Sequence, residues 1–260
     1  MTEENRQRQA LRALWKRTRG HPQLRRLVRE AVGITEVDYL GSTYEVHAVD
    51  NHTEFVLWLH DVPPEHEATI WLREAYTGKS VTIVDVGANA GLFSLPILAV
   101  LGARSKVLMF EPNPKMRLRL ERNIALNKFT GITIDPSAIG DRVGSAALNL
   151  SPANNMGAGR VDVAYKGGEQ IEVSICPLLD RVREAKLKKI DLLKVDIEGM
   201  EDRAIMPFLR DAPTSLLPNR VYFEDAHSEH WQENLTEALI AKGYSLLRRF
   251  GENALYERAT

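Results

Sequence analysis

The chain has 260 residues, of which 44% are hydrophobic and 27% charged, and its formal net charge is −1. This composition is typical of a globular enzyme, and the balanced charge argues against a nucleic-acid or membrane partner for the chain as a whole. The single cysteine, Cys176, excludes an intramolecular disulfide and a multi-cysteine metal site. We find no run of about 18 apolar residues and no signal-peptide core, so we expect a cytoplasmic protein.

The first 33 residues are basic, with nine Lys or Arg against three Glu. Apolar residues recur at helical spacing over residues 11–15 and again over residues 24–28. The pattern predicts two short helices that pack on the main domain and keep a solvated charged face. A lid, an arm of a homo-oligomer or a contact with an anionic substrate is the alternative interpretation.

Residues 43–50 and 53–60 both have β-rich composition and flank a short Asn-His step, which predicts a hairpin. A helix over residues 63–78 follows and ends at a glycine. We therefore expect residues 1–79 to form an N-terminal extension of helices and a hairpin, acting as a cap or substrate element. Residues 80–260 are expected to form the main domain.

From residue 81 onward, short apolar strands alternate with helical stretches, which predicts a mostly parallel sheet covered by helices. The chain closes with an expected antiparallel hairpin over residues 244–257. Cys176 lies in an alternating apolar segment and is expected to be a buried small side chain rather than a nucleophile. Pro96 should kink its helix or delay its start. The expected strands are 81–86, 106–112, 132–139, 191–197 and 220–226, and the expected helices are 91–102, 114–127, 201–212 and 230–243.

A glycine turn follows the first strand of this domain, and its sequence indicates what it holds. The dinucleotide pattern fails because large residues stand where the third glycine belongs, and no Walker lysine is present. The acid at the start of the turn would oppose a phosphate and favour a cation or an amine. S-adenosylmethionine, which carries an ammonium and a sulfonium, fits this field. The expected contacts are Asp85, Gly87, Ala88, Asn89 and Gly91.

Glu111 ends the next strand, where a carboxylate can accept hydrogen bonds from both hydroxyls of a ribose. The alternative is that Glu111 caps the helix that follows. Pro112 beside it joins the expected cofactor contacts, and Ser137, Ala138 and Ile139 at the end of the third strand are expected to lie along an adenine.

Together these motifs resemble the FkbM-type methyltransferase family over residues 80 to about 225. The resemblance implies a class I methyltransferase fold, which is a Rossmann-like, seven-stranded, mostly parallel sheet with helices on both faces. It also implies O-methylation of a sugar or natural-product hydroxyl with S-adenosylmethionine as methyl donor. The matching segments are DVGANAGLFS (85–94), FEPNP (110–114), NIALN (123–127), SAIGD (137–141), NNMG (154–157) and DLLKVDIEGMED (191–202).

Acidic residues follow two neighbouring strands on the expected side of the methyl acceptor. Asp196 and Glu198 are two residues apart and are expected to face one cleft as active-site groups. Glu224 and Asp225 follow the next strand, and His227 comes soon after. So many carboxylates repel one another unless a cation is present, and oxygen ligands favour Mg²⁺.

A resemblance to metal-dependent methyltransferases of macrolide sugars makes Asp196, Glu224 and Asp225 the ligands, with His227 or Glu198 as the base. The alternative interpretation is structural: Glu198 caps a helix, Glu224 and Asp225 form ion pairs, and His227 is a polar helix-start residue. Lys194 is expected to point away from Asp196 and not to act as a base.

The segment 151–163 is turn-prone and is expected to form either a hairpin or a wall of the substrate site, with Asn155 or Arg160 donating hydrogen bonds. The function expected overall is S-adenosylmethionine-dependent O-methylation of a small hydroxylated molecule. An N-methyltransferase or RNA methyltransferase is an alternative, although the basic residues are not interleaved with aromatic ones as in stacking platforms. A non-catalytic cofactor-binding module is the third possibility.

Overall fold

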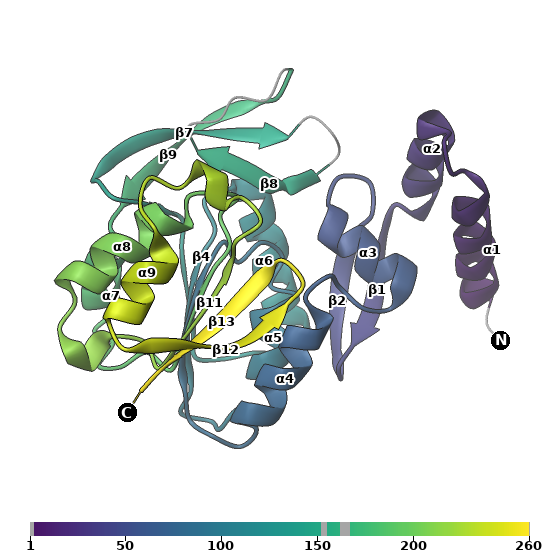
Figure 1. Ribbon diagram of the computed structural model, residues 1–260. Helices are drawn as coiled ribbons and strands as arrows, with labels where there is room; N and C mark the ends of the chain where they lie inside the picture. The colour runs from purple at the N-terminus through teal and green to yellow at the C-terminus, as the bar shows by residue number, and fades with distance from the viewer. Residues whose placement is uncertain (1–2, 152–154, 162–166, 260) are drawn as a thin grey trace.

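The computed structural model describes residues 3–151, 155–161 and 167–259, and within them a seven-stranded sheet forms the centre of the molecule (Figure 1). The strand order is β12-β13-β11-β10-β3-β4-β5. Only β13 runs against its neighbours in this sheet. The predicted class I methyltransferase fold and its closing hairpin are confirmed. The strands are β3 (Thr82–Val86), β4 (Lys106–Phe110), β5 (Ile132–Asp135), β10 (Leu192–Val195), β11 (Arg220–Glu224), β12 (Tyr244–Phe250) and β13 (Asn253–Arg258).

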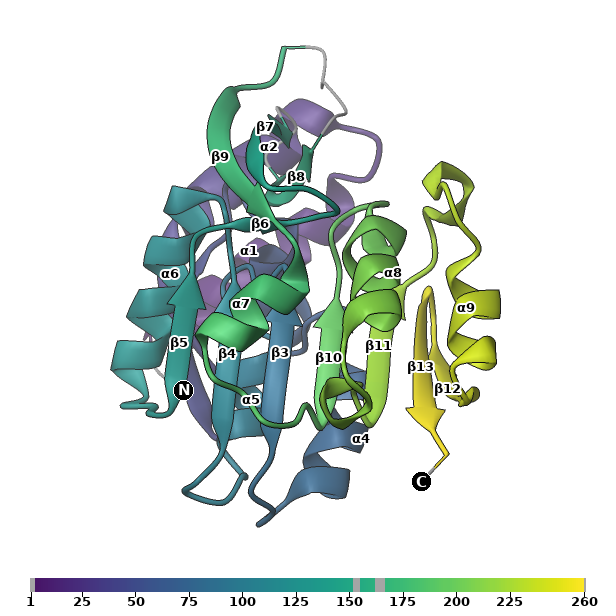
Figure 2. The ribbon, with the colours of Figure 1, turned by 90° about the vertical axis from the view of Figure 1, so that its left-hand side faces the viewer.

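Helices cover both faces of the sheet (Figure 2). One face packs on α7 (Leu178–Glu184), α8 (Glu201–Asp211) and α9 (Leu235–Ala241), and the other on α4 (His66–Tyr76), α5 (Ser94–Leu98) and α6 (Pro114–Leu126). Short 3-10 turns η1 (Thr214–Leu216) and η2 (Ser228–His230) lie beside β11. The central strands β3, β4, β10 and β11 read as nearly continuous apolar runs because both of their faces are buried. As predicted for the helix that contains Pro96, α5 begins late.

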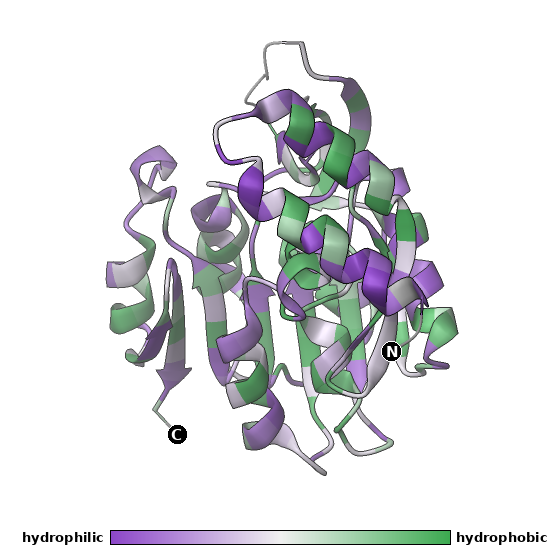
Figure 3. Ribbon diagram, turned by 90° about the vertical axis from the view of Figure 1, so that its right-hand side faces the viewer, coloured by the Kyte–Doolittle hydropathy of each residue, from purple (hydrophilic) through white to green (hydrophobic). Residues whose placement is uncertain are grey.

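The N-terminal extension begins with the two predicted helices, α1 (Glu3–Arg17) and α2 (Pro22–Val32), which Figure 3 shows in front of the main domain. Their charged face is not fully solvated, because Arg8 and Arg12 donate hydrogen bonds to Asp61 and to the Trp58 carbonyl. These arginines fasten the helices to the chain that follows. Within the described residues, no helix is long and apolar enough to cross a bilayer.

The predicted hairpin of residues 43–50 and 53–60 is wrong. The strand β2 (Ser42–His47) pairs instead with the preceding β1 (Ile34–Tyr39), and the second segment is the helix α3 (His52–His60). Asn51 caps this helix by accepting a hydrogen bond from the Glu54 amide. A cap and a distant ion pair therefore override the β propensity of the segment.

That ion pair joins the extension to the main domain. The Glu54 carboxylate is fully buried and lies 2.7 Å from the Arg119 guanidinium of α6, which also contacts Asp50. Apolar residues of both segments share one core, including Phe55, Leu72 and Ile83. The packing is therefore continuous across residues 79 and 80.

A smaller sheet of order β6-β9-β7-β8 lies above the carboxyl ends of β3 and β4. Of the segment 151–163, the structure describes Ser151 at the end of β7 and residues 155–161, which pair antiparallel with β7, while Asn154 lies outside the described residues. Cys176 ends β9 and is buried, as expected. The strands are β6 (Ala138–Ile139), β7 (Gly144–Ser151), β8 (Asn155–Val161) and β9 (Gln170–Cys176).

Candidate active site

Two adjoining cavities lie at the carboxyl ends of β3, β4 and β10, the edge where open α/β sheets bind ligands. One is polar and the other largely apolar, and they share Gly87, Pro112, Leu148, Gly159 and Ile197 as walls. The polar cavity is further lined by Thr53, Asn89, Glu111, Asn113, Asn155, Met156, Gly157, Asp196 and Glu198. The apolar cavity is further lined by Val86, Phe110, Ser137, Ala138, Ile139, Val161 and Met200.

Glu111 is held rigidly at the end of β4. Its two carboxylate oxygens accept hydrogen bonds from the backbone amides of Asn89 and Asn113, each at 2.8 Å. The cap of the following helix is Asn113, whose side chain accepts from the Lys115 amide, so Glu111 does not have the capping role. Burial raises the pKa of Glu111 to about 7. Its oxygens keep lone pairs for further donors such as ribose hydroxyls.

The glycine turn is shaped by close packing as well as by backbone conformation. Gly87 has a φ of +83°, and a Cβ there would lie 2.0 Å from the Asp196 carbonyl oxygen. The amides of Gly87 and Ala88 donate to the Phe110 carbonyl, which ties the turn to β4. Gly91 packs against Leu95 of the following helix. The turn therefore brings the ends of three neighbouring strands together.

The apolar cavity follows β6 and adjoins Glu111 through Pro112. Ser137, Ala138 and Ile139 line it, as expected for an adenine slot. All three residues are buried, and the slot is closed on the far side by Val161 and Met200. A planar apolar group of limited thickness matches such a slot.

The hairpin of β7 and β8 forms the roof of the polar cavity, so this segment is both a hairpin and a wall. The Asn113 side chain donates to the Met156 carbonyl, and Asn155 accepts from the His52 amide. The oxygen of the Asn155 side chain is therefore engaged by the chain, and Arg160 donates to the Glu198 carbonyl at 2.8 Å. The extension and the main domain both fix this roof.

Lys194 is buried beneath the site and corrects two expectations. Its ammonium donates to the Gly87 carbonyl at 2.7 Å and lies 3.4 Å from both Asp85 and Asp196. The expectation that it points away from Asp196 is wrong, because residues two apart on a strand share a side. Asp85 is fully buried and is absent from the walls of both cavities, so it neutralises Lys194 instead of facing a ligand.

The second group of acids gathers differently from the expected ligand set. Ligand atoms of Glu198, Glu224 and His227 lie within 4.8 Å of one another. Asp225 is held away by Arg249, with contacts of 2.5 and 3.1 Å. The structure therefore does not bring Asp225 together with Glu224 and Asp196 as a cation site.

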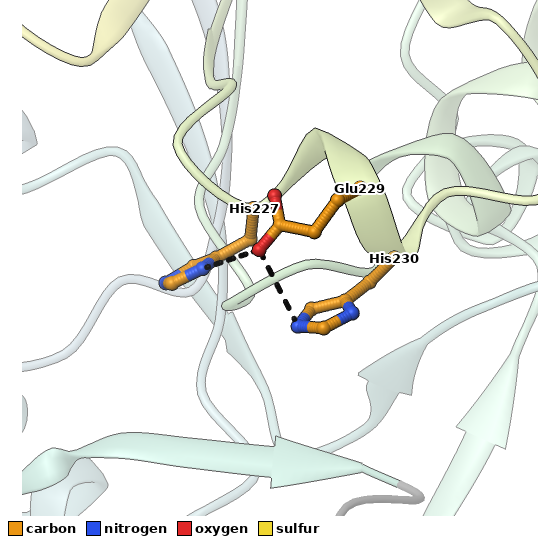
Figure 4. A group of neighbouring side chains, drawn as sticks. All are labelled: His227, Glu229 and His230. Carbon is orange, nitrogen blue, oxygen red and sulfur yellow. Dashed lines mark ion pairs between the residues drawn. The ribbon is translucent and has the colours of Figure 1, made fainter.

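His227 connects this group to the surface. Its Nε2 lies 3.7 Å from Glu198, and its Nδ1 lies 3.9 Å from Glu229, which also contacts His230 at 3.7 Å (Figure 4). The two rings are stacked with centroids 6.1 Å apart. Glu229 and His230 are exposed, so of these three residues His227 alone contacts the inner acids.

The inner acids resist ionisation. Burial, followed by repulsion from Asp196, raises the pKa of Glu198 to about 7. For Glu224 the same two causes, joined by repulsion from further acids, raise the pKa to about 8. Glu198 also has a φ of +60°, a rare conformation for this residue that is often found at functional sites. Carboxyl groups tuned in this way are suited to proton transfer near neutral pH.

Several site residues were missed in the sequence. Thr53 and Leu148 lie in no motif, and only their placement by the extension and the second sheet reveals them; Asn113 and Met156 lie within the FEPNP and NNMG segments but were not singled out as site residues. Asn113 follows the FEP segment and caps a helix, so its position next to Glu111 was the signal available.

Comparison with known proteins identifies the family of this chain. Residues 85–252 match the Methyltransferase FkbM domain family. The chain is 31% identical over 148 residues to "Methyltransferase sdnD" of Sordaria araneosa, covering 46% of this chain and 57% of that protein. It is 30% identical over 139 residues to "Methyltransferase 1" of Beauveria bassiana, covering 46% of this chain and 55% of that one. The chain thus spans little more than half the length of these curated relatives.

Among solved structures, the chain is similar to Methyltransferase FkbM from Methylobacillus flagellatus KT. The two share 16% sequence identity with a TM-score of 0.46, and the match covers 79% of this chain and 52% of that chain.

Proposed function

This chain belongs to the FkbM methyltransferase family, and we propose that it methylates a hydroxyl group of a small molecule with S-adenosylmethionine as donor. The acceptor we propose is a sugar or a glycosylated natural product. The observation that carries the proposal is the fixed Glu111 carboxylate between a polar cavity and an apolar slot. Membership of the family implies the cofactor, while the acceptor and the oxygen nucleophile are our inference.

The residues present fit S-adenosylmethionine. Glu111 would accept the ribose hydroxyls, the slot of Ser137, Ala138 and Ile139 would take the adenine, and the turn from Gly87 would carry the amino-acid end. Asp196 supplies negative charge on the cavity wall, which suits a sulfonium and an ammonium. The cofactor supplies an already activated methyl group.

The chain's own contribution to the reaction is position and a proton acceptor. An alcohol is a weak nucleophile while it keeps its proton, so a base must take it. Glu198 lines the cavity and has a pKa of about 7, so it can accept this proton near neutral pH. His227 lies beside Glu198 and can stabilise its position.

The same acids support a second mechanism that would replace proton transfer to Glu198. In it, a divalent cation lowers the pKa of the acceptor hydroxyl. Glu198, Glu224 and His227 would hold it, and this mixed set suits Mn²⁺ as well as the Mg²⁺ expected from oxygen ligands. Under this alternative, EDTA abolishes transfer, and Mn²⁺ or Mg²⁺ raises the melting temperature of the wild type but not of Glu224→Gln. Transfer that is indifferent to EDTA assigns the cluster to proton transfer alone.

Calorimetric titration tests the cofactor assignment. We expect S-adenosylmethionine to bind and NAD not to bind. Glu111→Gln should weaken the cofactor by about tenfold or more, since a hydrogen bond to a charged group contributes about 1.5–3 kcal/mol. The exposed Glu121→Gln on the neighbouring helix is the matched control and should bind normally. Absence of binding by the wild type at millimolar cofactor would refute the assignment.

Transfer of radiolabelled methyl groups then tests the acceptor class. We expect label to enter hydroxylated sugars or glycosides, and mass spectrometry of the product to place the methyl group on oxygen. Label that enters an amine or an RNA instead would replace the proposed acceptor while leaving the cofactor assignment in place.

A further inference from the structure

A third cavity, of about 360 Å³, is lined by the segment that leads into α4 and by the turn from β12 to β13, which lies at the same edge of the sheet as the end of β11. Its apolar walls are Val62, Pro63, Pro64 and Phe250, and Tyr222 of β11 also contributes to its wall. One side of this cavity therefore comes from the N-terminal extension and the other from the last hairpin of the main sheet.

Two buried polar groups border this cavity, and the rest of the chain satisfies them only in part. The Oε1 atom of Glu65 and the hydroxyl of Tyr222 are buried, and neither has a hydrogen-bond partner of good geometry among the described residues. Tyr222 as a whole is only 1% exposed. The two groups share one weak side-chain hydrogen bond with each other, which leaves the remaining capacity of both unused. Buried polar atoms of this kind are costly unless water or a ligand satisfies them.

The cavity is connected to the active site through the row of side chains across the sheet. Tyr222 pairs in register with Lys194, and Lys194 with Asp85. The Glu65 carboxyl interacts with Lys194 and is repelled by Asp196, and burial raises its pKa to about 7. Residues two apart on a strand share a side, so Tyr222 and Glu224 face the same way. Tyr222 in the wall of this cavity therefore lies on the same side of the sheet as Lys194 and Glu224.

We propose that this cavity binds the methyl acceptor, with Glu65 and Tyr222 as specificity-determining residues that receive its hydroxyl groups. The proposal rests on the proposed function, because it names the acceptor side of the same site. It also gives the extension a role as a substrate element.

The walls define the chemical class of the acceptor as a neutral hydroxylated ring with one apolar face. The apolar face packs on Pro63, Pro64 and Phe250, while hydroxyls hydrogen-bond to Glu65 and Tyr222. Anionic compounds should bind poorly, because the carboxyl groups of Glu65 and Asp196 would repel a negative charge in this cavity.

Saturation-transfer NMR with phenyl β-D-glucopyranoside, a neutral polyol ring bearing an apolar group, tests the proposal. The full chain is first saturated with S-adenosylhomocysteine, and the probe is then titrated. We expect millimolar binding by the wild type and about fivefold or greater weakening in Glu65→Gln and Tyr222→Phe, which each remove one hydrogen bond. Glu74→Gln, exposed on the same helix, is the matched control.

A further variant tests the cavity without changing a buried residue, in case Glu65→Gln or Tyr222→Phe does not fold. Pro64 is exposed at the rim, and Pro64→Trp should obstruct the cavity and weaken the probe without changing the affinity for S-adenosylhomocysteine. The proposal is overturned if the wild type shows no saturation transfer, if Glu65→Gln and Pro64→Trp bind the probe normally, or if the probe displaces S-adenosylhomocysteine. If the wild type does not bind S-adenosylhomocysteine, the proposed function fails, whereas probe binding that depends on Glu65 still supports the cavity.

Discussion

The carboxyl ends of β3 and β4 differ from those of β10 and β11 in how their acidic groups are balanced. At the first edge, Asp85 lies 3.4 Å from the Lys194 ammonium, and both oxygens of Glu111 are held by backbone amides. At the second edge, burial and repulsion from neighbouring acids raise the pKa of Glu224 to about 8. Among the described residues, none of the main influences on this pKa is a nearby cation.

This contrast separates binding from chemistry. The first edge has its hydrogen bonds and charges arranged before a ligand arrives, which is the condition for precise binding at low cost. At the second edge, repulsion from neighbouring acids adds to burial in raising the pKa of Glu198 and Glu224, and groups raised in this way can exchange protons near neutral pH. Each prediction below removes the feature that distinguishes one edge from the other.

Removing the cation beneath the first edge should have the largest effect. Lys194→Met leaves Asp85 buried without its counterion, and breaking a buried pair in this way costs about 3–5 kcal/mol. Chemical denaturation measures the loss. The double variant Asp85→Asn/Lys194→Met should recover the part of the loss that comes from Asp85, while the part that comes from Asp196 and Glu65 remains in both variants. Equal losses in the single and double variants would show that packing, not charge balance, sets the effect.

The glycine turn should be the next most sensitive feature. Gly87→Ala forces a Cβ to within 2.0 Å of the Asp196 carbonyl, in addition to the strain of a positive φ. Gly243→Ala is the matched control, since its φ of +84° is nearly the same but no atom lies within 4 Å. The control should lose only the strain of about 1–2 kcal/mol. We expect Gly87→Ala to unfold at clearly lower denaturant and to bind S-adenosylmethionine more weakly; equal losses would contradict this account of the turn.

At the second edge, Glu198→Gln should remove the base while sparing the cofactor. Positioned bases contribute about 10²–10⁴-fold to rate, so kcat should fall within that range with the affinity for S-adenosylmethionine nearly unchanged. In the wild type, kcat/KM should rise as pH passes about 7, because Glu198 then loses its proton. Glu233→Gln, exposed nearby, should keep both the rate and the pH profile. A profile that persists in Glu198→Gln would assign the ionisation elsewhere.

Much of the sheet could be predicted from the sequence, because buried parallel strands leave short apolar runs between helical segments. The failure at residues 53–60 has a distant cause. Glu54 is buried by an arginine 65 positions later, and Asn51 supplies a cap, so the segment becomes a helix despite its β-rich composition. Pairings across such separations are not visible in local patterns.

The candidate site was predictable where spacing decides the geometry. Glu111 and the segment 137–139 follow strand ends and line the cavities as expected. Lys194 was misjudged although the two-residue period of a strand would have placed it with Asp196. Asp225 could not be excluded from the acid cluster in advance, because Arg249, which holds it, comes from a different strand.

The smallest expected effect is a gain of stability from Glu224→Gln. The folded chain holds the Glu224 proton up to a pH of about 8, whereas the unfolded chain releases it near the ordinary value of 4.5. Between these values the folded state binds more protons than the unfolded state, so the free energy of unfolding falls as pH rises. A neutral glutamine avoids this loss, and the melting temperature of the variant should exceed that of the wild type by about 2–4 °C at pH 8.5 for each kcal/mol recovered.

At pH 5 the two should melt alike, and Glu172→Gln on an exposed strand should match the wild type at both pH values. Such a gain, accompanied by loss of methyl transfer, would identify Glu224 as a group kept for chemistry at the expense of stability; a variant that is less stable at pH 8.5 would show that the second edge is balanced after all.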